Sequence, residues 1–183
     1  MTALILILLF PLAGIPLLAL VGHWRHAGWI NIGLTAATLG ASLWLAFIVL
    51  EHGPLLSPGK LLYIDAFNVY LVTLTAFVGF TTAIFSRPYM QHEVETRQLG
   101  KRRMRLYHSM YQGFMFTMQA ALTTNNIGIL WVAMEGATLA TVLLVSLYRT
   151  PEAVEAAWKY FILCGVGIAQ ALFGTVLLYF AAE

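Results

Sequence analysis

The chain has 183 residues, of which 60% are hydrophobic and only 10% are charged, and its formal net charge at neutral pH is +2. Soluble domains have about a quarter of their residues charged, so this composition excludes an ordinary water-soluble domain. The charges also cluster between long apolar runs, which is the pattern of a multi-pass membrane protein. We therefore expect an all-α membrane helix bundle in which residues 1–183 form a single membrane domain.

Six membrane spans are predicted from apolar runs of about twenty residues, the length that a helix needs to cross the bilayer core. Their ranges are 3–22, 28–50, 64–86, 106–124, 126–148 and 155–181. The first run lacks a basic leader and continues through two prolines, so we interpret it as a retained span rather than a cleaved signal peptide. Gly53, Pro54 and Pro58 mark an irregular loop before the third helix, which Asp65 is expected to cap.

The basic residues fall almost entirely on one side of these spans. That side receives Arg25, Arg87, Arg97, Lys101, Arg102, Arg103, Arg105, Arg149 and Lys159, whereas the other side receives only Lys60. Because cytoplasmic loops carry the excess of Lys and Arg, both termini are expected outside and the 87–105 loop in the cytoplasm.

The later spans are expected to pack closely. A tight turn around Asn125 makes spans four and five antiparallel neighbours, and Thr150-Pro151-Glu152 is a typical helix start for span six. Small residues, which permit close approach of helices in lipid, occur in both spans. They are Ala133, Gly136, Ala137 and Ala140 in span five, and Gly165, Gly167, Ala169 and Gly174 in span six.

No cofactor site is expected. The single cysteine, Cys164, lies in an apolar run, and the chain has no CxxC pair, no Cys/His metal spacing and no glycine-rich nucleotide motif. We therefore predict no catalytic centre in this chain. The basic run at 101–105 adjoins a membrane span, which favours lipid headgroups over nucleic acid as its contact.

Glu135 is the principal candidate site, because it stands alone in the uncharged apolar stretch from Asn126 to Tyr148. A carboxylate at the centre of a membrane helix costs roughly 2.5–3.5 kcal/mol on insertion scales. Its functional interpretation is a protonatable group on an ion path. The alternative is a structural carboxylate, either paired within the bundle or kept protonated by burial.

Lys159 is the second candidate, about 12 Å along a sixth helix that begins at Pro151. Glu155 lies four residues earlier, which is the favoured order for a simple helical ion pair, and the lysine could also extend to the interface. Its depth is nevertheless compatible with a cavity opposite Glu135. Three other polar residues could contribute to a hydrated path, although interfacial or interhelical hydrogen bonding is their commoner use. These accessory candidates are His108, Thr138 and Gln170.

Several motifs resemble a known family, specifically so from about residue 60 onward. Tyr63-Ile-Asp-Ala-Phe opens the third span, Ser86-Arg-Pro-Tyr-Met closes it, and residues 125–180 follow the same pattern through two helices. These segments resemble the antiporter-like proton-translocating membrane subunits of complex I and energy-converting hydrogenases, within them the hydrogenase-4 component F branch. The resemblance implies a bacterial or archaeal inner membrane, and other membrane and peripheral subunits as partners.

By this resemblance Glu135 matches the acid of the family's fifth helix and Lys159 the lysine of its sixth. The family has about fourteen helices with two inverted five-helix repeats, and its fifth-helix acid pairs with a lysine of helix seven. Residues 1–105 would then supply three leading helices and the basic loop, and 106–183 the first three helices of an incomplete repeat. The chain is therefore expected to be an N-terminal fragment or one half of a split gene.

Three functions remain open at this point. The first is a proton-translocating subunit of a hydrogenase-4, formate hydrogenlyase or NADH:quinone oxidoreductase type of complex. The second is a subunit of a cation/proton antiporter without redox chemistry, and the third is a non-transporting scaffold. Whether the ion is H⁺ or Na⁺ is also open.

Overall fold

The structure is a computed structural model that describes residues 2–24, 26–96 and 99–182. Helices dominate it, and their bounds are α1 Thr2–Val21, α2 Ala27–His52, α3 Ala66–Glu95, α4 Lys101–Thr123, α5 Ile127–Val145 and α6 Pro151–Ala182. A short 3₁₀ turn, η1 Ser146–Tyr148, joins the last two helices. The predicted all-α membrane bundle is thus confirmed.

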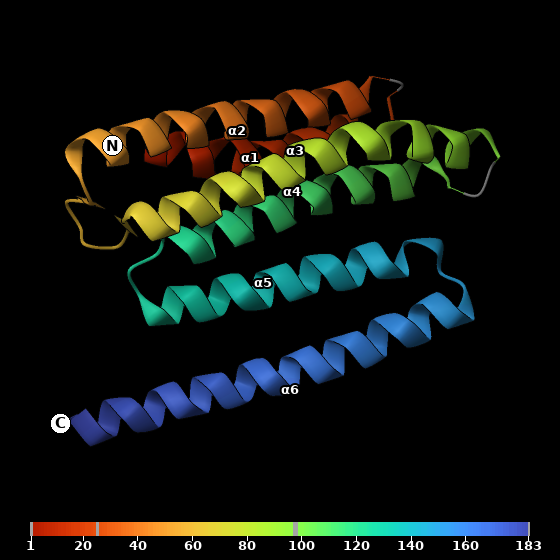
Figure 1. The fold of residues 1–183 in the computed structure, drawn as a ribbon. Coiled ribbons are helices and arrows are strands. Elements are labelled where there is room, and N and C mark those ends of the chain that lie inside the picture. Colours follow the sequence, from red (N-terminus) through yellow and green to blue (C-terminus); the bar gives the residue numbers. More distant parts are fainter. Residues whose placement is uncertain (1, 25, 97–98, 183) are drawn as a thin grey trace.

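The helices lie roughly side by side, and consecutive ones run in opposite directions (Figure 1). α1 to α4 form one group, in which α4 packs against both α1 and α3. α5 lies against the other side of α4, and α6 packs on α5 at the edge of the molecule. The predicted antiparallel arrangement of the fourth and fifth spans is confirmed, and α5 is the helix that separates α6 from the four-helix group.

Five of the described helices are long and apolar enough to cross a membrane: α1, α2, α3, α5 with η1, and α6. α4, the predicted fourth span, does not reach that hydropathy although it lies alongside the others (Figure 1). The reason is its many polar side chains. Most of the cations at the start of α4 are exposed, whereas five polar side chains further along it are buried within the protein: His108, Ser109, Gln112, Gln119 and Thr123. A helix covered by other helices needs less apolar surface than one that faces lipid.

The predicted loop at 87–105 is wrong in extent, because most of it is helical. α3 continues through Pro88 to Glu95, and α4 begins at Lys101, five residues before the predicted span. Arginine, lysine and methionine favour helix, so a membrane helix can continue into the interface where charges meet water. Arg87, read as a loop cation, instead lies in α3 with its guanidinium 4.2 Å from the centre of the Trp29 ring. Arg25 and Arg97 lie outside the described residues.

Polar caps fix the starts of three helices. The Asp65 carboxylate accepts a hydrogen bond from the Asn68 amide at 2.7 Å, as predicted for α3. Thr150 accepts one from the Ala153 amide at 3.2 Å, so the predicted opening of α6 is also confirmed. At the start of α5 the capping residue is Asn126, whose side chain accepts from the Ile129 amide at 3.1 Å. Each cap satisfies a backbone N–H that the first helical turn leaves free.

A small hairpin connects α2 to α3 where the sequence predicted only an irregular loop. Its strands, β1 Leu55–Leu56 and β2 Tyr63–Ile64, pair in antiparallel register. The third predicted span began at residue 64, which is therefore strand, and α3 begins only after Asp65. The hairpin also reaches the α4–α5 turn, because Asn125 donates its amide N–H to the Leu61 carbonyl at 2.7 Å and its side-chain N–H₂ to that of Lys60 at 3.0 Å.

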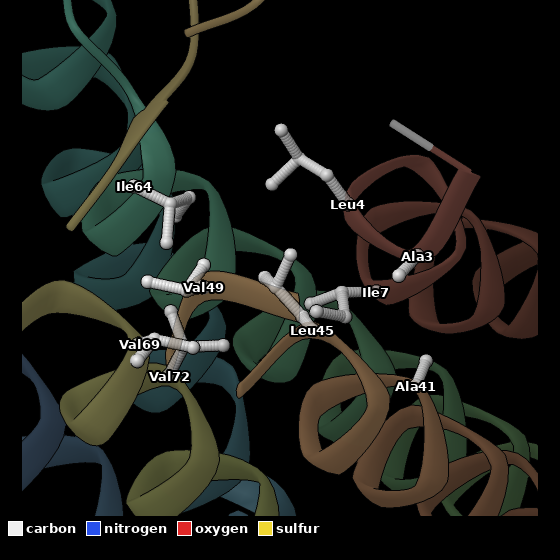
Figure 2. Close-up of a cluster of buried hydrophobic side chains, with 9 residues drawn as sticks. All are labelled: Ala3, Leu4, Ile7, Ala41, Leu45, Val49, Ile64, Val69 and Val72. Carbon is white, nitrogen blue, oxygen red and sulfur yellow. The ribbon is translucent and has the colours of Figure 1, made fainter. Parts of the chain in front are cut away.

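The main apolar cluster lies next to this hairpin (Figure 2). Leu4 and Ile7 of α1 meet Leu45 of α2 and Val72 of α3, and none of the four side chains is solvent-exposed. Close packing of this kind holds membrane helices together through van der Waals contact, because lipid tails remove most of the hydrophobic drive. The cluster makes α1, α2 and α3 a packed support on which α4 and then α5 rest.

Candidate functional site

Glu135 lies near the middle of α5 and is half-buried. Ala133 and Ala137, which lie two residues before and two residues after Glu135, are both buried. Gly136 faces α4, and a Cβ atom there would lie only 2.8 Å from the Thr117 Cγ2 atom. The small residues of span five therefore do bring α5 close to α4, as predicted.

One hydrogen bond sets the register between α5 and α6. The indole N–H of Trp131 donates to the main-chain carbonyl of Ile168 at 2.9 Å. Glu135 follows Trp131 by one turn and so shares this face of α5. Because α5 and α6 are antiparallel, the step of four residues from Trp131 to Glu135 corresponds to a step of four residues back from Ile168. This step puts Glu135 at the level of Cys164 and Gly165. A Cβ atom at Gly165 would meet nothing within 4 Å, so the described chain leaves this level of α6 open.

Lys159 is not brought into contact with Glu135. Its ammonium group pairs with the Glu155 carboxylate one turn away, and the two side chains are 70% and 65% exposed. By the same register Lys159 lies five residues from the level of Glu135, about 8 Å along the helix axis. The simple helical ion pair, one of the two interpretations of Lys159, is thus the arrangement present. Among the described residues, the Glu135 carboxylate has no ion pair or hydrogen bond.

The three accessory residues do not gather around Glu135. Thr138 is buried, but its hydroxyl donates back to the Met134 carbonyl of its own helix at 3.1 Å. Gln170 is exposed on α6. His108 is buried on α4, next to the Tyr107 ring, and its Nδ1 atom has no partner among the described residues. Among the described residues, none of these three side chains hydrogen-bonds to the Glu135 carboxylate, and their part in a hydrated path stays a prediction.

The predicted close packing by the glycines of span six is also absent from the described structure. Like Gly165, the positions of Gly167 and Gly174 have nothing within 4 Å of a Cβ atom built on them. Within the described part of α6 only Ala157 is buried, so most of this helix presents apolar side chains outward. That surface is suited to lipid or to further helices.

A buried polar pair between α2 and α4 was missed by the sequence analysis. Gln112 donates from Nε2 to the Asn31 Oδ1 atom at 2.8 Å, and both side chains are almost fully buried. Two turns further along α4, the side chain of Gln119 donates a hydrogen bond to the Val72 carbonyl of α3 at 3.2 Å. The signal that could have found this pair is the asparagine within an otherwise apolar α2, because such residues commonly bond across membrane helices.

A second missed group lies at the basic end of the bundle, where α3 meets η1. The hydroxyls of Tyr89 and Tyr148 are 3.1 Å apart, and Arg103 of α4 donates to the Tyr148 carbonyl at 3.2 Å. Glu93 is buried beside Tyr148, and its Oε2 atom has no partner among the described residues. These contacts fasten η1, and with it the end of α5, to α3 and α4.

The chemistry available at Glu135 is that of a single carboxylate. Within the part of the chain that the structure describes, no group of three or more His, Cys, Asp and Glu residues could hold a metal ion. A carboxylate in an apolar helix can bind and release a proton, or pair with a cation that another helix supplies. The geometry therefore supplies an acid that has an open side and no ion-pair or hydrogen-bond partner among the described residues.

Comparison with known proteins finds a relative that supports the resemblance. No protein-family model matches the chain. A hydrogenase-4 component F homolog of Methylacidiphilum infernorum (isolate V4) is 48% identical over 177 residues, which is 97% of this chain. Over these residues the chain is similar to a hydrogenase-4 component F homolog.

The match covers 36% of that relative, so the chain spans about a third of its length. The homology confirms the resemblance that the motifs at 63–67, 86–90 and 125–180 indicated. Together with five helices apolar enough to cross a bilayer, it supports a multi-pass membrane protein.

Proposed function

We propose that the chain serves as a proton-translocating membrane subunit of a hydrogenase-4 or related complex, in which electron transfer in partner subunits is coupled to proton movement. The relative's name supports an assembly of the hydrogenase type. The basic end of the bundle would face the cytoplasm, following the positive-inside bias. No redox group is assigned to this chain, because its role would be to move the proton.

One observation carries this proposal: the carboxylate of Glu135 lies in the middle of an apolar helix with no ion-pair or hydrogen-bond partner among the described residues. An acid of this kind is costly unless it is neutralised, hydrated or paired. Protonation removes the cost, and a cation brought close by another helix restores the charge. Glu135 would thus alternate between a protonated and an ionised form.

The position of Glu135 favours this role over a purely structural one. A structural carboxylate is expected to be fully buried and hydrogen-bonded within the bundle. Glu135 is instead half-buried, on the face of α5 that meets α6, at a level where Gly165 leaves space. A neighbouring helix or a file of water could approach the acid there.

The test is Glu135→Gln in the hydrogenase complex that contains the chain. We expect electron transfer and assembly to persist while proton translocation into vesicles falls at least about a hundredfold, the lower range for losing a positioned proton-transfer group. The matched control is Glu51→Gln, which removes an exposed carboxylate at the end of α2 and should leave both activities unchanged.

Two outcomes would contradict the proposal. Unchanged translocation in Glu135→Gln would mean that the acid takes no part in proton movement. Failure of the complex to assemble with this near-isosteric change would mean that the carboxylate is structural, as in the scaffold interpretation.

A further inference from the structure

A groove at the basic end of the bundle is lined by four arginines and by apolar side chains. It has a volume of about 620 Å³ and lies between α1, α4 and the end of α5 with η1. We call it the arginine groove, after its cations Arg102, Arg103, Arg105 and Arg149. Among the described residues that line the groove there is no acid. Two of the arginines are held by neighbours: Arg103 donates to the Tyr148 carbonyl at 3.2 Å, and Arg105 donates from Nε to the His23 Nδ1 atom at 3.0 Å.

The wall below the arginines is apolar. Ala19 of α1, Leu106 and Met110 of α4, and Leu143 and Leu147 beside η1 form this wall. The groove therefore combines a positive rim at the level of the interface with an apolar channel that runs along the helices. This combination of surfaces matches a phospholipid, which has an anionic headgroup joined to acyl chains.

Arg149 stands between this groove and a second one. The second groove has a volume of about 440 Å³, lies between α5 and α6, and is lined mainly by apolar residues including Val142, Trp158 and Phe161. Ser146 and Arg149 line both grooves. A headgroup held at Arg149 would thus have an apolar channel on each side of α5.

The backbone at Arg149 makes this arginine unusual. Its φ is 55°, in the left-handed region where a helix usually ends on glycine or asparagine. Side chains at such positions are strained, and strain of this kind is often found at ligand sites. An arginine where glycine would fit better points to a use for its guanidinium, which binds phosphate through paired hydrogen bonds.

We infer that the arginine groove binds an anionic phospholipid, with its phosphate between Arg102, Arg105 and Arg149, and that a two-phosphate, four-chain lipid of the cardiolipin type fits best. The two phosphates match a site with Arg102, Arg105 and Arg149 around it, and the four acyl chains match the channels on the two sides of α5. The site lies at the end that the basic bias assigns to the cytoplasmic leaflet, where anionic lipids are attracted by lysine and arginine. It is independent of Glu135 and so of the proposed proton role.

The experiment counts lipids bound to the full chain in detergent by native mass spectrometry. The chain is titrated with cardiolipin, phosphatidylglycerol and phosphatidylcholine, and the variant is Arg149→Gly. We expect cardiolipin to bind most tightly, and the variant to bind it about fivefold more weakly, as expected for one basic residue at a membrane surface. Because glycine prefers the backbone conformation of Arg149, thermal unfolding should not shift to a lower temperature, and reduced binding cannot then be ascribed to misfolding.

The matched control is Lys60→Gly. Lys60 also has a positive φ, 53°, but lies in the hairpin at the opposite end of the bundle. Its replacement removes a cation in the same backbone setting, and cardiolipin binding should stay at the wild-type level. Inorganic pyrophosphate should not displace the lipid, because it lacks the acyl chains.

Three results would overturn the inference. These are equal binding of phosphatidylcholine and cardiolipin, wild-type binding by Arg149→Gly, and equal losses in Arg149→Gly and Lys60→Gly. Displacement by pyrophosphate would assign the arginines to a free anion or an acidic segment of a partner rather than to a lipid.

Discussion

Trp131 of α5 holds α6 by donating its indole N–H to the Ile168 carbonyl at 2.9 Å. This contact matters because α6 packs mainly on α5 and, in its described part, buries only Ala157. Trp131→Phe keeps an aromatic ring but removes the donor. We expect the free energy of unfolding to fall by about 0.6 kcal/mol, the average for hydrogen bonds between membrane helices.

Denaturation in mixed detergent micelles measures this change. The matched control is Trp44→Phe, since Trp44 is 49% exposed and lies on α2, away from α6. An equal loss of stability in both variants would show that ring size rather than the hydrogen bond is responsible.

The contact of Gly136 with Thr117 predicts that α5 cannot tolerate a larger residue there. In Gly136→Ala the new methyl group would lie 2.8 Å from Thr117 Cγ2, and a β-branched side chain has little freedom to move aside. We expect a loss of about 1–3 kcal/mol, the range for overpacking.

The same contact supplies the rescue for that variant. Thr117→Ser removes the Cγ2 atom but keeps the hydroxyl that donates to the Gly113 carbonyl at 3.1 Å. The double variant should therefore recover most of the stability lost by Gly136→Ala alone. Thermal unfolding in detergent measures all three variants, and no recovery would mean that the strain arises elsewhere.

The ion pair of Lys159 with Glu155 allows the two interpretations of Lys159 to be separated. If the pair is only a surface contact, breaking it from either side has the same small effect, less than about 1 kcal/mol on stability. If Lys159 is a proton carrier, Lys159→Gln should lower translocation at least about a hundredfold, whereas Glu155→Gln leaves the lysine charged and free.

Proton translocation by vesicles containing the complex is the measurement, with electron transfer as the internal reference. We expect the asymmetric result, because we propose that proton movement uses the Lys159 ammonium group together with Glu135, and not the Glu155 carboxylate. If Lys159→Gln and Glu155→Gln lower proton translocation by the same small amount, Lys159 has only a structural role.

The boundaries of most helices could be predicted from the sequence, because the change from lipid to water limits each apolar run. The prediction failed at the basic ends of α3 and α4, where arginine and lysine continue the helix beyond the apolar region. It also missed the hairpin, whose two-residue strands carry no periodic signal. Residue type and chain position were therefore sufficient to place the apolar helical segments but not to give the structure of the segments that connect them.

The site shows a similar division. That Glu135 would lie mid-helix followed from its apolar surroundings, but its orientation did not, since an almost uniformly apolar helix has no polar face to indicate rotation. The register came only from Trp131 and Ile168, which are far apart in sequence. For the same reason the pairing of Asn31 with Gln112 could not be assigned, because either side chain has many possible partners until the helices are placed.

The two ends of α5 are both tied to other elements. At one end the hairpin carbonyls of Lys60 and Leu61 hold Asn125, and at the other Arg103 holds the Tyr148 carbonyl. Hydrogen bonds at both ends oppose sliding of α5 along its axis, although the helix can still bend or rotate slightly between them. If Glu135 changes charge as proposed, we expect its side chain to rotate about its own bonds before the α5 backbone moves.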